Sequence, residues 1–191
     1  QYLCDADPVL SRVIKVVGTI NTTYREPNFE AFVRIVINQQ LSDKAASTIY
    51  GRIRSSLGGD VTPKSVVKSN PQNLLKCGIS RQKLMSIIGI AEKFLAKPNF
   101  LQKLERLGND EAVQELTSLR GIGVWSASIF LLFCLRRPDI FPEGDVSLEK
   151  AINSIYPNIG VRDEAIIAWS PHKSTAALHL WAWIDMGMPN Y

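Results

Sequence analysis

The sequence predicts an all-α protein. Apolar residues recur at intervals of three and four along the whole chain, and no segment keeps the alternating pattern of a half-buried strand for long. Capping residues, prolines and glycines mark helix starts and stops at regular places along this pattern. With 46% hydrophobic residues among 191, the chain is long enough to bury one continuous core, in one domain or in two closely packed lobes. The same composition excludes a chain that is disordered throughout.

Start and stop signals place the helices of the first half of the chain. Pro8 begins a helix and Gly18 ends it, because proline suits the first helical turn and glycine suits the position after the last one. Ser42 is a favoured capping residue for a later helix. Thr62-Pro63 and Asn70-Pro71 repeat the capping pattern. The expected helices of this half cover residues 8–17, 29–37 and 43–57, followed by two short helices that begin at 63 and 71.

The second half continues the helical pattern to the end of the chain. Ser80 begins a long helix that Pro98 ends, and Asn109 caps the next one. The segment 124–135 is apolar on nearly every side, which predicts a central, buried helix. The remaining expected helices cover residues 146–155, 162–169 and 172–186.

The charged residues favour polyanionic partners without identifying one. The sequence has 22 Lys and Arg residues against 18 Asp and Glu residues, a formal net charge of +4. No run of five like charges occurs, which excludes a basic tail that holds nucleic acid by charge alone. Any phosphate binding would therefore come from folded geometry.

Cysteine and histidine usage excludes several kinds of site. Three cysteines, Cys4, Cys77 and Cys134, are far apart and odd in number, which predicts reduced thiols in an intracellular protein and not a disulfide framework. The chain has no CxxC pair, no HExxH motif and two histidines, so a structural zinc site or iron–sulfur cluster lacks ligands. The longest apolar stretch, residues 122–135, is too short to cross a bilayer, so we expect no membrane span.

The segment Leu119-Arg120-Gly121-Ile122-Gly123, between two expected helices, is the first motif with functional content. The glycines allow a tight turn, Ile122 anchors the turn in the core, and the amides at the start of the next helix stay exposed. Orphan N–H groups and the helix dipole there favour an anion such as phosphate. An ordinary turn between helices can have the same residues, so this motif alone leaves both interpretations open.

Four further motifs give the hairpin a context. Gly121–Ala127 is followed by Pro142-Glu143-Gly144-Asp145, Asn38–Ser42 lies earlier, and Trp-Ser-Pro-His-Lys-Ser and Leu-His-Leu-Trp lie in residues 169–181. Together they resemble the helix-hairpin-helix (HhH-GPD) DNA glycosylases, and within them the 3-methyladenine (AlkA/MAG-like) branch. The resemblance runs from Phe29 to Trp181.

The resemblance implies a fold and a place for the active site. It predicts a two-lobed, all-α HhH-GPD glycosylase fold of minimal size, with the active site in the cleft between the lobes. Residues 28–135 would form the lobe that contains the hairpin. Residues 1–27 and 136–191 would form the second lobe.

By this resemblance Asp145 is the catalytic residue. It would stabilise the cationic sugar that forms as the N-glycosidic bond breaks and help to direct water to C1′. Its place at the start of a helix suits this role, because the helix dipole there favours negative charge. Aspartate is also a common helix cap, and Glu143 is the alternative carboxylate in the same segment.

Two tryptophans are candidates for the base pocket. Trp125 occupies the position at which bifunctional relatives carry a Schiff-base lysine, so the resemblance implies a monofunctional enzyme without AP lyase activity. Trp125 and Trp181 would hold a flipped, cationic alkylated purine between aromatic faces. Both could instead be core residues. Val146 stands where this branch often has an aromatic residue.

The remaining site residues would contact the DNA duplex. Gln40 and Leu41, after the helix that begins at Phe29, would intercalate where the base has left; Leu41 could instead pack under the corner. Single basic residues near these loops, Lys44, Arg120 and Lys173, could contact phosphate. The hairpin residues expected to bind the DNA backbone are Gly121, Ile122, Gly123 and Ser126.

The resemblance also bears on cofactors and partners. No cofactor is required, although the backbone carbonyls of Thr117, Leu119 and Ile122 could hold a monovalent cation, Na⁺ or K⁺, at the hairpin. The partner would be double-stranded DNA that contains damaged bases, bound by a monomer in the cytoplasm, nucleoid or nucleus. His179 is expected to satisfy a contact within a buried helix.

The predicted function is removal of alkylated purines, 3-methyladenine and also 7-methylguanine, in base excision repair. Three alternatives remain at this level: a glycosylase for a different base lesion, a helix-hairpin-helix module that binds DNA without catalysis, and an all-α interaction domain that binds no nucleic acid. Salt dependence of DNA affinity separates the last of these from the others.

Overall fold

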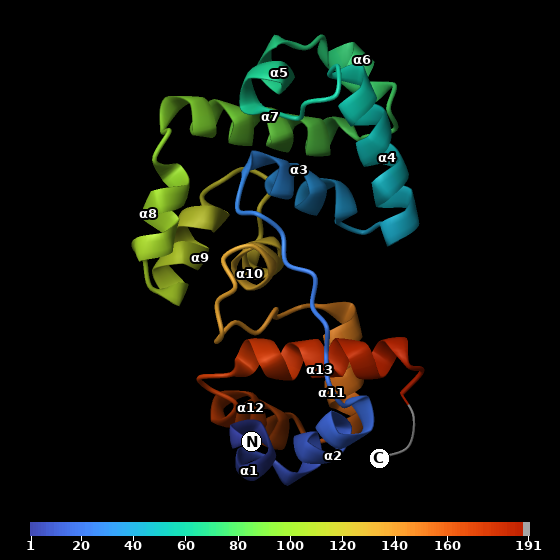
Figure 1. Ribbon diagram of the computed structural model, residues 1–191, viewed down its shortest axis with the longest axis vertical. Coiled ribbons are helices and arrows are strands. Elements are labelled where there is room, and N and C mark those ends of the chain that lie inside the picture. The colour runs from blue at the N-terminus through green and yellow to red at the C-terminus, as the bar shows by residue number, and fades with distance from the viewer. Residues whose placement is uncertain (189–191) are drawn as a thin grey trace. The chain divides into compact units, whose positions relative to one another are not determined.

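The structure, a computed structural model, describes residues 1–188, and the secondary structure within this range is entirely helical (Figure 1). This confirms the all-α prediction. The helices are α1 (Tyr2–Ala6), α2 (Pro8–Val17), α3 (Phe29–Asn38), α4 (Asp43–Ser56), α5 (Pro63–Lys68), α6 (Pro71–Leu75), α7 (Arg81–Ala96), α8 (Phe100–Arg106), α9 (Asn109–Thr117), α10 (Val124–Phe133), α11 (Val146–Ile155), α12 (Ile159–Ala168) and α13 (Lys173–Asp185). No helix among these residues is long and apolar enough to span a membrane.

The chain divides into two compact units. Unit 1 contains residues 1–24 together with the chain from residue 131 onward, and unit 2 contains residues 25–130. One boundary, 24/25, lies between α2 and α3, and the other, 130/131, lies within α10, whereas the sequence placed the boundaries at 27/28 and 135/136. Each unit draws its core from helices that are amphipathic or apolar all round, as the sequence pattern requires.

Unit 2 is built around α3 and α7. Helix α7 packs against α3 on one side and α5 on another, and Figure 1 shows it lying across the unit between them. Where α3 and α10 meet, the rings of Phe32 and Phe130 stack with centroids 4.1 Å apart. Further phenylalanines surround this pair: Phe29, Phe94 and Phe100. This aromatic core fixes the helices that carry the hairpin.

Helix α8 was not predicted from the sequence. It has only seven residues, but Phe100 and Leu104, one turn apart, are fully buried. The predicted cap of the next helix was also wrong by one residue: Gly108 is the N-cap of α9, and Asn109 is its first residue. Glu111 makes this start possible, because its carboxylate accepts a hydrogen bond from the Gly108 N–H at 3.0 Å.

Glu115 joins three helices of unit 2. Its carboxylate lies 2.6 Å from Lys103 Nζ of α8 and 3.4 Å from Lys93 Nζ of α7. The hydrogen bond from Lys103 is the main cause that lowers the pKa of Glu115 below its ordinary value of 4.5. A lowered folded-state pKa stabilises the protein above the unfolded-state pKa, and this contribution is lost as the pH falls through the folded-state pKa.

We therefore expect Glu115→Gln to lower the free energy of unfolding by about 1 kcal/mol at neutral pH. The difference from the wild type should shrink as the pH falls through the lowered pKa of Glu115, because the wild-type carboxylate then becomes protonated as well. Urea unfolding over a series of pH values from neutral downward measures it, with Glu105→Gln on the exposed side of α8 as the control. A difference that does not change with pH would contradict this account of Glu115.

Unit 1 is held together by α13 and by a buried carboxylate. Helix α13 packs against α11 and α2, and α1 packs against α2 (Figure 1). Asp7, 5% exposed, caps α2 through hydrogen bonds from the N–H groups of Val9 and Leu10. Its second oxygen accepts hydrogen bonds from Tyr156 Oη and, at 2.7 Å, from Trp169 Nε1. One side chain thus links the N-terminal helices to the C-terminal part of the unit.

Candidate functional site

Asp145 is the N-cap of α11. The segment before it turns sharply: Gly144 has φ +76°, and the Asp145 N–H donates to the Pro142 carbonyl at 3.3 Å. Asp145 Oδ1 accepts a hydrogen bond from the Leu148 N–H at 2.9 Å. The predicted helix from Val146 to Ile155 has these bounds in the structure. The half-buried carboxylate therefore lies at the positive end of a helix dipole.

The same carboxylate oxygen has a second donor. Trp181 Nε1 of α13 lies 3.1 Å from Asp145 Oδ1. The indole also packs against Phe133, with ring centroids 5.7 Å apart. The sequence indicated Trp181 as an aromatic surface for a base. It did not indicate this hydrogen bond from the indole Nε1, because the two residues are far apart in the sequence. Both donors stabilise negative charge on Asp145.

The hairpin turn connects α9 to α10. Ile122 is buried at 4% exposure, as the sequence predicts for the anchor of the turn, and its N–H donates to the Leu119 carbonyl at 3.1 Å. Gly121 has φ +82°, a conformation that other residues rarely adopt. A Cβ atom at Gly121 would lie 2.0 Å from Ser86 Oγ and 2.6 Å from Ser86 Cβ. The turn therefore requires glycine here for two separate reasons.

We expect Gly121→Ala to destabilise the protein by about 2–4 kcal/mol, because it adds overpacking against Ser86 to the strain of a positive φ. Gly123→Ala is the matched control, since nothing lies within 4 Å of a Cβ at that position. Urea unfolding of both variants measures the difference. Equal stability of the two variants would contradict the close packing of the hairpin on α7.

The residues predicted to bind phosphate have different surroundings in the structure. The N–H of Ile122 is engaged within the turn by Leu119, so it does not point out toward an anion. Ser126 is 3% exposed, and its Oγ accepts a hydrogen bond from Gln39 Nε2 at 2.9 Å, so its side chain holds the fold together. Gly121 and Gly123 are exposed, and the backbone amides of the first turn of α10, that of Ser126 included, have no acceptor within the helix. Amides of this kind at the start of a helix are favourable partners for an anion.

The predicted intercalating residues lie in an exposed turn after α3. Gln40 has φ +56° and its side chain is exposed, and Leu41 is 38% exposed. The turn is followed at once by α4, which Ser42 caps. Some DNA-binding proteins insert apolar side chains between bases, and Leu41 has the exposure that such insertion would need.

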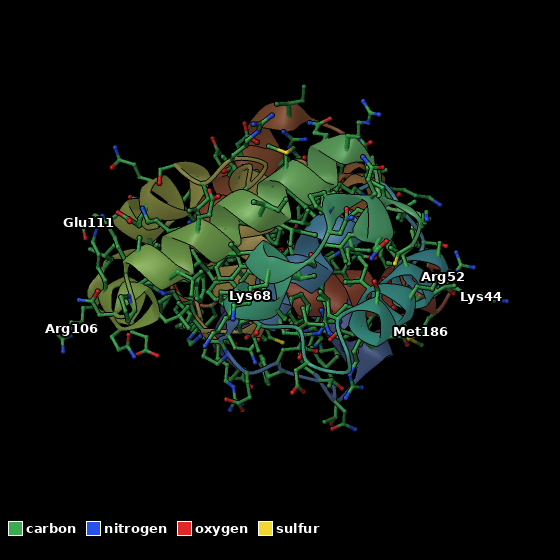
Figure 2. The ribbon with its side chains drawn as sticks, turned by 90° about the horizontal axis from the view of Figure 1, so that it is seen from above. Lys44, Arg52, Lys68, Arg106, Glu111 and Met186 are labelled. Carbon is green, nitrogen blue, oxygen red and sulfur yellow. The ribbon has the colours of Figure 1, made fainter. Side chains whose placement is uncertain are left out.

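Basic side chains lie on or near the turn after α3, the hairpin and the start of α13. Lys44 and Arg52 project outward from α4, away from the side of unit 2 where Arg106 and Glu111 lie (Figure 2). Arg120, next to the hairpin glycines, is exposed, whereas Lys173 is half-buried at the start of α13. Lys44 and Arg120 therefore have the exposure that a phosphate contact needs.

Trp125 and His179, two further residues that the sequence analysis singled out, lie in α10 and α13. Trp125 lies in the first turn of α10 and is half-buried. His179 is 8% exposed, and its Nδ1 lies 2.8 Å from the Thr175 carbonyl one turn earlier in α13, which confirms the predicted contact within its own helix.

The predicted cation ligands are main-chain carbonyls around the hairpin. Thr117 is the last residue of α9, where helix carbonyls have no N–H partner further along the helix. The Leu119 carbonyl accepts one hydrogen bond, from Ile122, which leaves its second lone pair for another partner. This donor chemistry fits a hard cation. No group of three or more His, Cys, Asp or Glu side chains within residues 1–188 has the geometry of a metal site.

Comparisons with known proteins show the family to which the chain belongs. A model of the HhH-GPD superfamily of base excision DNA repair proteins matches residues 33–168. The chain is 30% identical over 193 residues to DNA-3-methyladenine glycosylase 1 of Schizosaccharomyces pombe, across 94% of this chain and 84% of that protein.

Solved structures show the same likeness. The crystal structure of DNA-3-methyladenine glycosidase from Bacillus halodurans matches with a TM-score of 0.85 and 30% identity, across all of this chain and 90% of that one. The 3-methyladenine DNA glycosylase of S. pombe in complex with abasic DNA matches with a TM-score of 0.85 and 28% identity, across all of this chain and 98% of that one. The chain therefore belongs to the HhH-GPD superfamily of base excision DNA repair proteins.

Proposed function

We propose that this protein is a monofunctional DNA glycosylase that removes alkylated purines, 3-methyladenine above all, from double-stranded DNA. The observation that carries the proposal is the Asp145 carboxylate, held by the start of α11 and by the indole N–H of Trp181. The relatives named as 3-methyladenine glycosylases support the substrate class.

Asp145 acts on the sugar. The base departs with the electron pair of the N-glycosidic bond, which leaves positive charge on C1′ and the ring oxygen. The carboxylate neutralises this charge, and a water molecule then adds to C1′ and gives up one proton to the carboxylate or to solvent. Because the alkylated purine is already cationic, it leaves as a neutral base and needs no proton from an acid.

Trp125 and Trp181 supply the aromatic surface for a flipped base. A cationic purine gains about 0.5–2 kcal/mol for each well-placed ring face. Trp181 is fixed for this role by the hydrogen bond to Asp145 at its edge and by contact with Phe133. Val146 is 83% exposed, so the position after the aspartate contributes no aromatic surface.

The hairpin and the turn after α3 bind the duplex. The backbone amides of Gly123 and the first turn of α10 hold a backbone phosphate, and Gln40 and Leu41 fill the space that the base has left. A monovalent cation on the carbonyls of Thr117, Leu119 and Ile122 would add positive charge beside that phosphate. The protein binds DNA as a monomer and needs no other cofactor.

The proposed chemistry excludes strand cleavage. A lyase reaction needs an amine that forms an imine with C1′, and Trp125 has none at the position where bifunctional relatives carry lysine. Borohydride should therefore trap no covalent complex between the protein and abasic DNA. A trapped complex would contradict the monofunctional part of the proposal and would identify the amine when digested and sequenced.

The substrate is tested by competition between lesions. Duplexes that each contain one 3-methyladenine, 7-methylguanine, 8-oxoguanine or uracil are incubated with the protein, and the free bases are identified by chromatography against a reaction without protein. We expect 3-methyladenine to be released fastest. Release of only oxidised bases or uracil would favour a glycosylase for a different lesion, and tight DNA binding without release of any base would favour a non-catalytic module.

A further inference from the structure

The turn that carries Gln40 and Leu41 has a backbone conformation that needs support. Helix α3 ends at Asn38, and Gln40 then adopts φ +56°, a left-handed conformation that costs free energy for a residue other than glycine. One local hydrogen bond, from the Leu41 N–H to the Asn38 carbonyl at 3.1 Å, closes the turn. Such a conformation persists only where surrounding contacts determine it.

Lys83 of α7 supplies the first of these contacts. Its Nζ donates hydrogen bonds to the Ile37 carbonyl at 2.7 Å and to the Gln39 carbonyl at 2.6 Å. These carbonyls lie at the negative end of α3, where an ammonium group is favourable. The Lys83 side chain is half-buried beneath the turn, and this burial lowers its pKa below the ordinary value.

Gln39 supplies the second contact and reaches the hairpin. Its Nε2 donates to the Gly121 carbonyl at 2.9 Å and to Ser126 Oγ at 2.9 Å. One amide group therefore joins the turn after α3 both to the segment that connects α9 to α10 and to the first turn of α10. Ser126 is itself buried in α10, so the Gln39 amide reaches a fixed part of the fold.

Helix α7 supports both partners of this contact. Lys83 and Ser86 lie three residues apart on α7 and hence on one face of it. Lys83 holds the carbonyls of the turn, and Ser86 packs so closely against Gly121 that no Cβ fits between them. The turn, the hairpin and α7 therefore form one junction within unit 2.

We propose that Gln39 is a positioning residue that couples phosphate binding at the hairpin to insertion of the Gln40-Leu41 turn into the duplex. The junction sets a fixed separation between the amides that hold a phosphate and the side chains that replace the extruded base. This inference rests on the proposed function, because it assigns Gln39 to the DNA-distorting step that precedes base release.

Gln39→Leu is the direct test, since leucine has a similar size and removes both hydrogen bonds. Single-turnover base release is measured on two DNAs, one with 3-methyladenine paired in a duplex and one with the same lesion in a single-nucleotide bulge, where extrusion needs little help. We expect the rate on the duplex to fall about tenfold, for two hydrogen bonds of ordinary strength. The rate on the bulge should stay within about threefold of the wild type, because the chemical groups are unchanged.

Two further variants complete the design. Ser126→Ala removes one acceptor of the Gln39 amide from the other side of the contact and should give a smaller fall with the same dependence on the DNA. Gln102→Leu is the matched control, because Gln102 lies exposed on α8. If Gln39→Leu does not fold, Ser126→Ala and the milder Gln39→Met carry the test.

Some outcomes would overturn the proposal. Equal rates for Gln39→Leu and wild type on the paired lesion would remove Gln39 from the coupling. An equal loss on the paired and the bulged lesion would show a general defect of the fold and not a loss of coupling.

A readout without chemistry separates this inference from the proposed function. The fluorescence of 2-aminopurine in the duplex rises when a base leaves the stack. If the wild type raises this fluorescence but releases no base, the proposed glycosylase activity is wrong. The coupling is then supported if Gln39→Leu abolishes the rise in fluorescence, and it is overturned if the rise remains. If neither protein raises it, both proposals fail.

Discussion

Asp145→Asn is expected to slow base release greatly while DNA binding and folding are retained. Asparagine keeps an oxygen that can cap α11 and accept the Trp181 N–H, so the local structure should persist. It removes the negative charge that stabilises the cationic sugar, which should lower the single-turnover rate by about 10²- to 10⁴-fold. The rate is followed on a duplex with one 3-methyladenine, and affinity on a duplex with a stable abasic-site analogue.

Glu143→Gln is the matched control, because this second carboxylate lies exposed in the same segment. It should release the base at the wild-type rate. Loss of activity in Glu143→Gln with full activity in Asp145→Asn would transfer the catalytic role to Glu143. Equal base release by all three proteins would remove both carboxylates from the mechanism.

Asp7→Ala is expected to destabilise the protein more than any other single change considered for unit 1. It leaves the N–H groups of Val9 and Leu10 uncapped and the buried donors of Tyr156 and Trp169 without their acceptor. Loss of the cap and of two buried hydrogen bonds should lower the free energy of unfolding by about 3–5 kcal/mol. Urea unfolding measures the change.

Two variants separate the contributions at Asp7. Asp7→Asn can keep the cap through one oxygen but sets an NH₂ group against the donors of Tyr156 and Trp169, so its loss should be about 1–3 kcal/mol. Asp5→Asn, on the exposed face of α1, should change stability by less than about 0.5 kcal/mol. Similar losses in Asp5→Asn and Asp7→Asn would contradict the importance of the buried network.

Helix positions followed from local chemistry wherever a capping signal was strong. Ser42, Ser80 and Asp145 each cap the helix that the sequence assigns to them. Short elements were harder: α8 has too few residues to show a periodic pattern, and α1 was not predicted for the same reason. Helix α12 begins at Ile159, earlier than predicted, because Asn158 caps it through the Gly160 N–H.

The candidate site was only partly visible in the sequence. The resemblance to the glycosylase family pointed to Asp145 and the hairpin glycines, which lie in short motifs that can be recognised in the sequence. The contact between Trp181 and Asp145 depends on how α13 packs against α11, and the contact between Gln39 and Gly121 joins residues 82 positions apart. No local pattern encodes either contact. The burial of Ser126 likewise follows from the tertiary packing of α10, not from its place beside the glycines.

The most direct test of the central claim is the fate of one duplex that contains a single 3-methyladenine. The wild-type protein is incubated with this DNA, the free base is identified by chromatography, and the length of the damaged strand is measured in the same sample before any alkaline treatment. The account predicts stoichiometric release of free 3-methyladenine and an intact strand that breaks only when heated in alkali. DNA that is bound tightly and keeps its base, or a strand already cut without alkali, would contradict it.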